Sequence, residues 1–454
     1  MENLIFSEIL SLVEEKKYGK AKQILVTMNG VDIAELFEEL PTEYRLKIFR
    51  LLPKELAADT FVEIDSDLQE FFIKGFSDKE LKQVVSELYA DDAVDIIEEM
   101  PANVVKRILK QANPEMRKDI NELLKYPDDS AGSLMTTEFV DLKCDITVEE
   151  AIKHIKKTGI DKETVNTCYV TQKGRVLIGT VTLRSIVIAN KDEKITDIMD
   201  ANPLFVTTDE DREKVALSFN KYGLLAMPVV DTEKRLVGIV TVDDVLEVIE
   251  EETTEDIAKM AAIVPTDKTY FKTGILETFK VRFPWLILLM ISGTFTSLII
   301  SSYEAKLTLF PALIAFIPML MGTAGNSGGQ SSATIIRAIS LGEVGFKDVI
   351  KVIWKETRVA FFCGLILAVV NFFKIRFIDI ALFGSTATII DNLIVSLTIL
   401  LTVIVAKCIG SFLPLFANKI GLDPAVMASP IITTAVDIIV LVIYFGLATV
   451  LLGI

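Results

Sequence analysis

The chain has 454 residues, of which 51% are hydrophobic and 24% are charged. This composition is too apolar for an ordinary soluble protein and too charged for a protein that lies wholly inside a membrane. The charge is unevenly divided, because residues 1–280 carry a net charge of −19 whereas residues 281–454 carry +3. An acidic front part of this kind repels nucleic acid and attracts cations, which argues against DNA or RNA as a partner.

The cysteines indicate neither a disulfide framework nor a zinc site, and the N-terminus shows no secretory signal. Four cysteines are scattered along the chain without the CxxC spacing of a zinc site or the pattern of a disulfide framework. Residues 1–18 lack the apolar core of a secretory signal. We therefore expect the region before the first membrane helix to stay in the cytosol.

Short amphipathic helices separated by prolines are predicted for the first part of the chain. The segment LFEELP at 36–41 resembles IIEEMP at 96–101. A proline after each apolar turn ends one helix and starts the next. Repeated helix–turn units of this type stack on one another, so we predict an all-α superhelical domain over residues 1–130.

The pattern changes at about residue 131, where two similar segments follow each other. In the first, LMT at 134–136 leads to GTVTL at 179–183, and in the second, IMD at 198–200 leads to GIVTVDD at 238–244. This internal duplication resembles a tandem pair of cystathionine-β-synthase (CBS) domains.

Each of the two segments has the elements that an α/β domain needs. Helices are predicted over 147–156 and 212–222, each followed by β-rich strands. We place the two CBS domains at 131–195 and 196–252. The resemblance implies a regulatory module that senses a small ligand, commonly an adenine nucleotide or an ion.

Acidic residues are concentrated where the CBS pair ends. Residues 250–256 include five acids, and no basic residue follows before Lys259. Like charges one turn apart destabilise a helix by a few tenths of a kcal/mol per pair. A connecting helix over 253–281 that carries such charges could be a solvated surface, or a switch that responds to a cation.

Five apolar stretches follow, each near the roughly 20 residues that a membrane-spanning helix needs. They lie at about 283–302, 309–336, 352–374, 388–416 and 425–452. We therefore predict a five-helix membrane domain over residues 282–454.

Basic residues favour one orientation of this domain in the cytoplasmic membrane. They cluster before the first stretch and between the second and third, where they are Arg337, Lys347, Lys351, Lys355 and Arg358. The positive-inside rule then places the N-terminus in the cytosol and the C-terminus outside. An odd number of helices disfavours a simple internal two-fold repeat, so we expect a pore between two copies of the chain.

The second apolar stretch is unusually rich in small and polar residues. Residues 318–332 include four glycines, and Asn326 and Gln330 lie one turn apart. Small residues allow close packing of membrane helices, which is one interpretation. The two amides are more polar than packing requires, which favours a role in an ion path.

The fifth apolar stretch contains an acid, Asp437, about 20 Å from its cytosolic end. A charged Asp at such a depth costs about 2.5–3.5 kcal/mol, so it should face a wet cavity or a partner. Thr433 and Thr434 lie on the same face, and Pro430 is expected to free carbonyl oxygens nearby. The alternative is an ion pair with Lys407, the only basic residue in the middle of a predicted span.

Carboxylates, hydroxyls, amides and carbonyls are hard oxygen ligands, which suit Mg²⁺, Ca²⁺ or Mn²⁺. Mg²⁺ usually keeps several waters and binds through one or two carboxylates. Two symmetry-related Asp437 side chains around a hydrated ion would fit this behaviour, and the residues alone do not separate Mg²⁺ from Ca²⁺, Mn²⁺ or Co²⁺.

Two other classes of membrane protein fit less well. An intramembrane metalloprotease needs two histidines at HExxH spacing, and the only histidine of the chain is His154. A CBS-regulated anion channel would need basic residues in its path, whereas the buried charge identified here is an acid. We therefore do not expect an enzyme.

From end to end, the chain resembles the MgtE family of magnesium transporters or channels. The specific motifs are GNSGGQ at 325–330 and Asp423-Pro424, followed by Ser429-Pro430 and Asp437. The resemblance implies a homodimer that carries Mg²⁺ through a pore lined by the second and fifth membrane helices. The residues implied to line the pore are Asp437, Thr433, Ser429, Asn326, Gln330 and Asp423.

The resemblance also implies that Mg²⁺ bound between the cytosolic domains closes the pore. The acids that match the family's regulatory sites are Asp59, Asp91, Asp211, Asp244, Glu247, Glu252, Glu255 and Asp256. Gly223 stands where some relatives have an acid, and Ser429 stands where some have an amide. ATP is a second candidate ligand, at the CBS pair.

Overall fold

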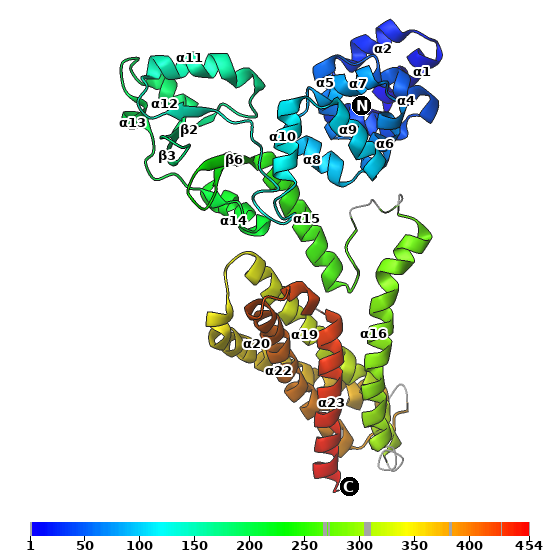
Figure 1. The fold of residues 1–454 in the computed structure, drawn as a ribbon. Coiled ribbons are helices and arrows are strands. Elements are labelled where there is room, and N and C mark those ends of the chain that lie inside the picture. Colours follow the sequence, from blue (N-terminus) through cyan, green and yellow to red (C-terminus); the bar gives the residue numbers. More distant parts are fainter. Residues whose placement is uncertain are drawn as a thin grey trace. The chain divides into compact units, whose positions relative to one another are not determined.

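The computed structural model describes residues 2–266, 270, 273–303, 310–380, 384–427 and 429–453. They form two compact units, Met1–Val248 and Ile249–Ile454, which are described separately (Figure 1).

The first unit begins with a run of short helices. These are α1 (Glu2–Glu14), α2 (Tyr18–Leu25), α3 (Gly30–Glu39), α4 (Thr42–Phe49), α5 (Lys54–Val62), α6 (Ser66–Gly75), α7 (Asp78–Val85), α8 (Ala90–Glu98), α9 (Ala102–Gln111) and α10 (Pro114–Leu123). Pro41, Pro53 and Pro101 directly precede α4, α5 and α9, as the sequence pattern predicts. The predicted N-terminal helical domain is confirmed.

Two small α/β domains follow. The first contains β1 (Asp141–Lys143), α11 (Val148–Thr158), the 3₁₀ helix η1 (Gly159–Asp161), β2 (Thr167–Thr171), β3 (Leu177–Thr182), α12 (Leu183–Ile188) and α13 (Ile195–Ile198). The second contains β4 (Val206–Thr207), α14 (Arg212–Tyr222), β5 (Ala226–Val230) and β6 (Leu236–Thr241). In each domain the first strand pairs parallel to the second, which pairs antiparallel to the third. The repeated topology confirms the predicted duplication.

The apolar core of the N-terminal helices continues into the second α/β domain. Phe219 of α14 belongs to the same buried cluster as Ile97 of α8 and Ile120 of α10. Val245 and Val248, at the start of the next helix, belong to it as well. The side chains of α8 and the start of that helix therefore share one packed region.

The connecting helix differs from its predicted bounds of 253–281. Helix α15 runs without a break from Val242 to Met260. Two residues after its end, Ala262 has a left-handed φ of 55°, and the Ile263 N–H donates to the Ala258 carbonyl oxygen. This is a Schellman-type helix end, and Pro265 follows it. Local C-capping therefore stops the helix well before the membrane domain.

The second unit contains the apolar helices. They are α16 (Ile275–Ser302), α18 (Pro311–Ile314), α19 (Ile317–Ser340), the 3₁₀ helix η2 (Phe346–Asp348), α20 (Val349–Lys374), the π-helix η3 (Ile375–Asp379), α22 (Ile389–Lys419), the 3₁₀ helix η4 (Pro424–Met427) and α23 (Ser429–Leu452). Among the described residues, four segments are long and apolar enough to cross a membrane: Ile275–Ser302, Phe346–Asp379, Ile389–Lys419 and Pro424–Leu452.

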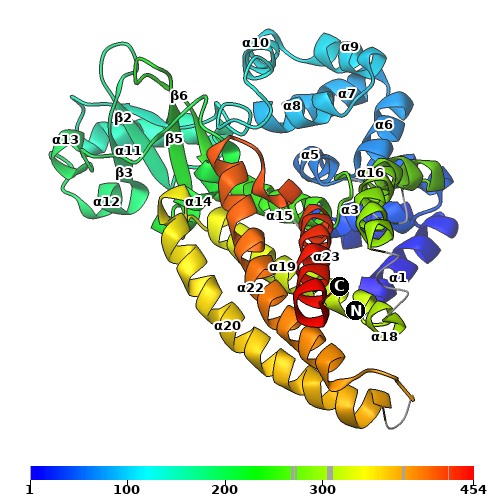
Figure 2. The same cartoon turned by 90° about the horizontal axis from the view of Figure 1, so that it is seen from below.

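Helix α19 corresponds to the remaining predicted span. Its 24 residues are long enough to cross a membrane, at about 36 Å, but its glycines and polar residues make it less apolar. It packs along α22 and α23 inside the bundle (Figures 1 and 2). The count of five spans therefore stays a prediction.

Glycines bring three of these helices into close contact. A Cβ atom on Gly410 of α22 would lie 2.2 Å from the Gly328 carbonyl oxygen of α19. A Cβ on Gly328 would lie 2.9 Å from Ile432 of α23, and one on Gly325 would lie 3.1 Å from Thr433. Any larger residue at Gly410 would push α19 and α22 apart, so close packing through small residues is a structural role of this motif.

Candidate functional site

Asp437 lies in α23, nine residues from its start, half-buried within an apolar span. Because α23 begins at Ser429, Asp437 is about 12 Å from that helix end rather than the expected 20 Å. Within the described part of the chain, no lysine or arginine forms an ion pair with it. The structure thus keeps an acid in the span without a cationic partner.

The neighbours of Asp437 on α23 correct one expectation. Pro430 lies in the first turn of α23, where a proline starts a helix and does not break one. The hydroxyls of Thr433 and Thr434 both donate to the Pro430 carbonyl oxygen, at 2.9 and 3.0 Å. The Pro430 carbonyl oxygen is therefore already satisfied, whereas the carbonyls that the proline was expected to free are those near Ser429 and Val426. The Ser429 side chain lies outside the described residues.

Helix α19 has two different faces. Gly325 and Gly328 are buried against α22 and α23, as described above. Asn326 and Gln330 are exposed on another face, one turn apart, and Thr334 extends the same polar stripe. Close packing and an ion path were alternative interpretations of this motif. In the structure the glycines provide the close packing. The exposed amides remain candidates for the ion path.

Lys407 has partners that the sequence interpretation missed. Its Nζ donates to the Ser331 hydroxyl at 3.2 Å and lies 4.0 Å from the Glu356 carboxylate. The Ser331 hydroxyl donates to Glu356 Oε2 at 2.7 Å. All three side chains are buried, and they join α19, α20 and α22. Lys407 therefore forms its ion pair with Glu356 and not with Asp437.

Replacing Glu356 alone is expected to destabilise the membrane bundle by about 3–5 kcal/mol, because Lys407 would stay buried without a carboxylate. The measurement is thermal unfolding of the purified full chain with Glu356→Gln. The matched double variant Glu356→Met/Lys407→Leu removes both charges and is expected to recover most of the loss. Equal destabilisation of the single and double variants would contradict the pairing.

A second group of acids lies in the first unit. Asp91 and Asp92 of α8 face Asp244 at the start of α15, with Glu138 and Glu163 from two loops nearby. The Asp91 Oδ1 and Glu163 Oε2 atoms are buried, and neither has a hydrogen-bond partner among the residues that the structure describes. Asp244 is partly satisfied, because its Oδ2 accepts a hydrogen bond from the Thr241 hydroxyl.

The raised pKa values of these acids show that their charged forms are disfavoured in this arrangement. Burial raises the pKa of Asp92 to about 6, with a further contribution from Asp244. Burial and the nearby Asp92 raise the pKa of Glu163 to about 7. The pKa of Asp91 is raised well above its usual value by burial, and then by Asp92 and Asp244. Carboxylates held together without a cation repel one another, so a divalent ion would stabilise this arrangement.

Acids of the first unit do not form a ready-made metal site. Over the described residues, no three Asp, Glu, His or Cys side chains are gathered closely enough to hold an ion. Burial raises the pKa of the Tyr89 hydroxyl, and the nearby acids add to this in the order Glu163, Asp92, Glu138 and, last, Asp59 of α5. Asp211 has a different position, because its carboxylate caps α14 by accepting from two backbone N–H groups. Glu247 follows Asp244 by three residues on α15.

The remaining predicted acids meet in the second unit. Lys259 of α15 forms an ion pair with Asp423 at 2.7 Å and another with Glu255. Asp256 accepts a hydrogen bond from Ser340 of α19 at 3.3 Å. Burial raises the pKa of Asp256, and the nearby Asp423 raises it further. The Lys259 ammonium group lies between Glu255 and Asp423 and therefore links the end of α15 to the ends of the membrane helices.

In the sequence, Lys259 only marks the end of the acidic run. Its place as an internal counter-ion depends on Asp423, which is far away in the chain. Glu252 lies one turn before Glu255 and Asp256 on α15, half-buried. Of the predicted regulatory acids, Glu255 and Asp256 thus lie with Asp423, and Asp91 lies with Asp244.

Comparisons with known proteins agree along the whole chain. Residues 28–129 match the MgtE intracellular N domain, residues 131–192 and 195–251 match the CBS domain, and residues 317–447 match a family described as divalent cation transporter. The magnesium transporter MgtE of Thermus thermophilus is 33% identical over 100% of this chain and 99% of that protein. The magnesium transporter MgtE of Bacillus subtilis is 30% identical over 99% of this chain and 98% of that protein.

Solved structures resemble about half of the chain. One is the cytosolic domain of the Mg²⁺ channel MgtE in complex with ATP, at 32% identity and a TM-score of 0.52, covering 54% of this chain and 99% of that one. Another is the soluble part of a magnesium transporter, at 28% identity and a TM-score of 0.52, covering 56% of this chain and 99% of that one. Full-length similarity to two curated relatives shows that the chain belongs to the MgtE family of divalent cation transporters.

Proposed function

We propose that this chain carries Mg²⁺ across the cytoplasmic membrane through a pore between two copies. The observation that carries the proposal is Asp437, an acid inside an apolar span that no cationic side chain of the described residues neutralises. A buried acid of this kind marks an ion pathway, because its charge needs either water or a cation. The names of the full-length relatives support Mg²⁺ as that cation.

Two copies of the chain would complete the ion site. One carboxylate is a weak site for a divalent ion, whereas two Asp437 side chains and retained waters suit Mg²⁺. The exposed stripe of Asn326 and Gln330 on α19 offers further hard oxygen ligands. Thr433 and Ser429 precede Asp437 on α23, and Asp423 lies before that helix. In this homodimer they would line the path toward the cytosolic mouth.

The proposed orientation places the N-terminus in the cytosol and the C-terminus outside. Basic residues around the α19–α20 loop support it through the positive-inside rule. A membrane potential that is negative inside would then drive the ion inward, with about 4.6 kcal/mol per 100 mV for two charges. No chemical reaction is needed, and we propose that the protein is not an enzyme.

Mg²⁺ would also regulate the pore from the cytosolic side. One place where a bound cation would relieve repulsion is Asp91 Oδ1 beside Asp244, which has no hydrogen-bond partner among the described residues. A second is the Asp256–Asp423 pair, where Lys259 is the counter-ion that a bound cation would have to displace or join. Each site that binds only the closed state favours it by about 2.7 kcal/mol when Mg²⁺ is at 100 times its Kd. A related cytosolic domain was solved with ATP, so we propose ATP as an additional ligand of the CBS pair.

Growth of a bacterium that lacks Mg²⁺ transport tests the main proposal. Expression of the full chain is expected to restore growth at low external Mg²⁺. Purified protein in liposomes with an inside-negative potential is expected to take up Mg²⁺ faster than Ca²⁺, Mn²⁺ or Co²⁺. Failure to rescue growth together with faster Ca²⁺ or Mn²⁺ uptake would make the protein a transporter of that ion instead.

A further inference from the structure

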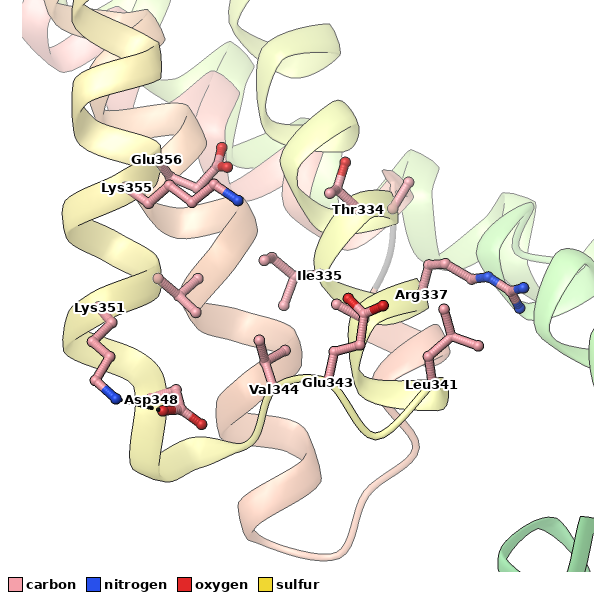
Figure 3. A pocket seen from close by; sticks show the side chains of 13 residues that line it. Thr334, Ile335, Arg337, Leu341, Glu343, Val344, Asp348, Lys351, Lys355 and Glu356 are labelled. Carbon is pink, nitrogen blue, oxygen red and sulfur yellow. Dashed lines mark hydrogen bonds and ion pairs between the residues drawn. The ribbon is translucent and has the colours of Figure 1, made fainter. Parts of the chain in front are cut away.

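A cavity of about 760 Å³ lies at one end of the membrane bundle, apart from Asp437. It is formed by the last turns of α19, the loop that follows and the first turns of α20 (Figure 3). Thr334, Ile335 and Arg337 line it from α19, while Lys355 and Glu356 line it from α20. Figure 3 shows the Arg337 guanidinium at the edge, pointing away from α20. No part of the proposed ion path requires a cavity here.

The cavity has apolar walls and a basic rim. Its walls are built by aliphatic side chains from both helices and the loop, which are Ile335, Ala338, Leu341, Val344 and Val352. Its cations are Arg337, Lys351 and Lys355. A ligand that matches both features has a hydrocarbon tail, which suits the apolar walls, and an anionic head, which suits the cations.

Acids in the lining are mostly neutralised by other groups. Asp348 pairs with Lys351 at 3.3 Å, which Figure 3 marks by a dashed line. At the buried end of the cavity, Glu356 accepts a hydrogen bond from Ser331 and forms an ion pair with Lys407. Among the described residues, Arg337 and Lys355 have no ion-pair partner, and Glu343 is the one lining acid left to oppose them. The unsatisfied charge of the cavity is therefore positive.

We infer from a neighbouring aromatic residue that this cavity lies at the level of the lipid headgroups. Trp354, between Lys351 and Lys355 on α20, is 63% exposed, and the Arg358 guanidinium lies 5.6 Å from the centre of its ring. Tryptophan is enriched at the membrane–water interface, where its apolar ring and polar N–H are both accommodated. Basic pockets between membrane helices at this level are suited to anionic lipid headgroups.

We propose that the cavity between α19 and α20 binds one anionic phospholipid, with its phosphate at Lys355 and the first part of an acyl chain against the aliphatic wall. Arg337, at the edge of the cavity, adds positive potential for the same headgroup. Phosphate oxygens accept hydrogen bonds from guanidinium and ammonium groups. The bound lipid would hold the end of α19, the helix that carries Asn326 and Gln330. The site is independent of which ion the protein transports.

Native mass spectrometry of the purified full chain tests this site. After exchange into mixed micelles, the wild type is expected to retain phosphatidylglycerol at least about tenfold more than phosphatidylcholine. Arg337→Gln/Lys355→Gln is expected to lose this preference. The control Lys280→Gln/Arg282→Gln removes two exposed charges from α16 and is expected to keep it.

Three results would overturn the proposal. The first is equal retention of the two lipids by the wild type, which needs no variant and therefore stands even if the double variant fails to fold. The second is unchanged preference in Arg337→Gln/Lys355→Gln. The third is displacement of the lipid by millimolar inorganic phosphate, which would assign the cations to a free anion.

Discussion

Replacing Asp437 with alanine is expected to reduce Mg²⁺ uptake at least about 100-fold in liposomes with an inside-negative potential. In the proposed dimer the change removes both carboxylates that face the ion. Losing about 2.7 kcal/mol of ion stabilisation is already a 100-fold effect, since each 1.4 kcal/mol is a factor of ten. The variant should fold, because a charged Asp in this position is itself unfavourable in an apolar span.

Two further variants make this result specific. Asp437→Asn keeps the shape and one oxygen but loses the charge, so uptake is expected to fall nearly as far. Asp379→Asn is the matched control, because Asp379 is paired with Lys374 at 3.0 Å and lies outside the proposed path. Its uptake should stay near the wild type. Full growth rescue by Asp437→Ala, with normal amounts of protein in the membrane, would refute the role of Asp437.

Elements marked by local signals could be predicted from the sequence. The helix expected at 212–222 is α14 (Arg212–Tyr222), because Asp211 caps its start and Gly223, with φ of 62°, ends it. Such signals lie within a few residues of the element that they control. The apolar spans were predictable for the same reason, because length and composition suffice for a membrane helix.

Contacts between distant residues could not be predicted in this way. Lys407 and Glu356 are 51 residues apart, and nothing in either local pattern shows that α20 and α22 bring them together. The Lys259–Asp423 pair depends in the same way on how α15 meets the membrane helices. Pro430 misled for a different reason: a proline frees carbonyls only when a helix already precedes it.

Raising the pH in the absence of Mg²⁺ is expected to loosen α8 in the full-length protein. Asp92 and Glu163 have pKa values raised to about 6 and about 7, whereas both would titrate near about 4 in an open chain. The packed state therefore binds more protons than the open state between these limits. Its stability falls as pH rises from about 4 through the raised pKa values of these acids.

Hydrogen exchange of the α8 amides, corrected for the intrinsic effect of pH, measures this opening. Exchange at pH 8 without Mg²⁺ is expected to be roughly tenfold to a hundredfold faster than at pH 5, because each unit of raised pKa is worth up to about 1.4 kcal/mol. Saturating Mg²⁺ should restore protection at pH 8, since its linkage free energy is of similar size. At pH 5 the acids are protonated, and Mg²⁺ should have little effect.

Neutral variants decide whether the acids of α8 are a sensor or only a solvated surface. Asp91→Asn/Asp244→Asn removes two of the facing charges, so α8 is expected to stay protected at pH 8 and to lose most of its response to Mg²⁺. Glu87→Gln, an exposed acid just before α8, is the matched control and should behave like the wild type. A wild-type α8 that responds to Ca²⁺ or ATP but not to Mg²⁺ would reject Mg²⁺ as the regulatory ligand. An unchanged Mg²⁺ response in the double variant would place the sensor elsewhere, with the group around Asp256 and Asp423 as the next site to test.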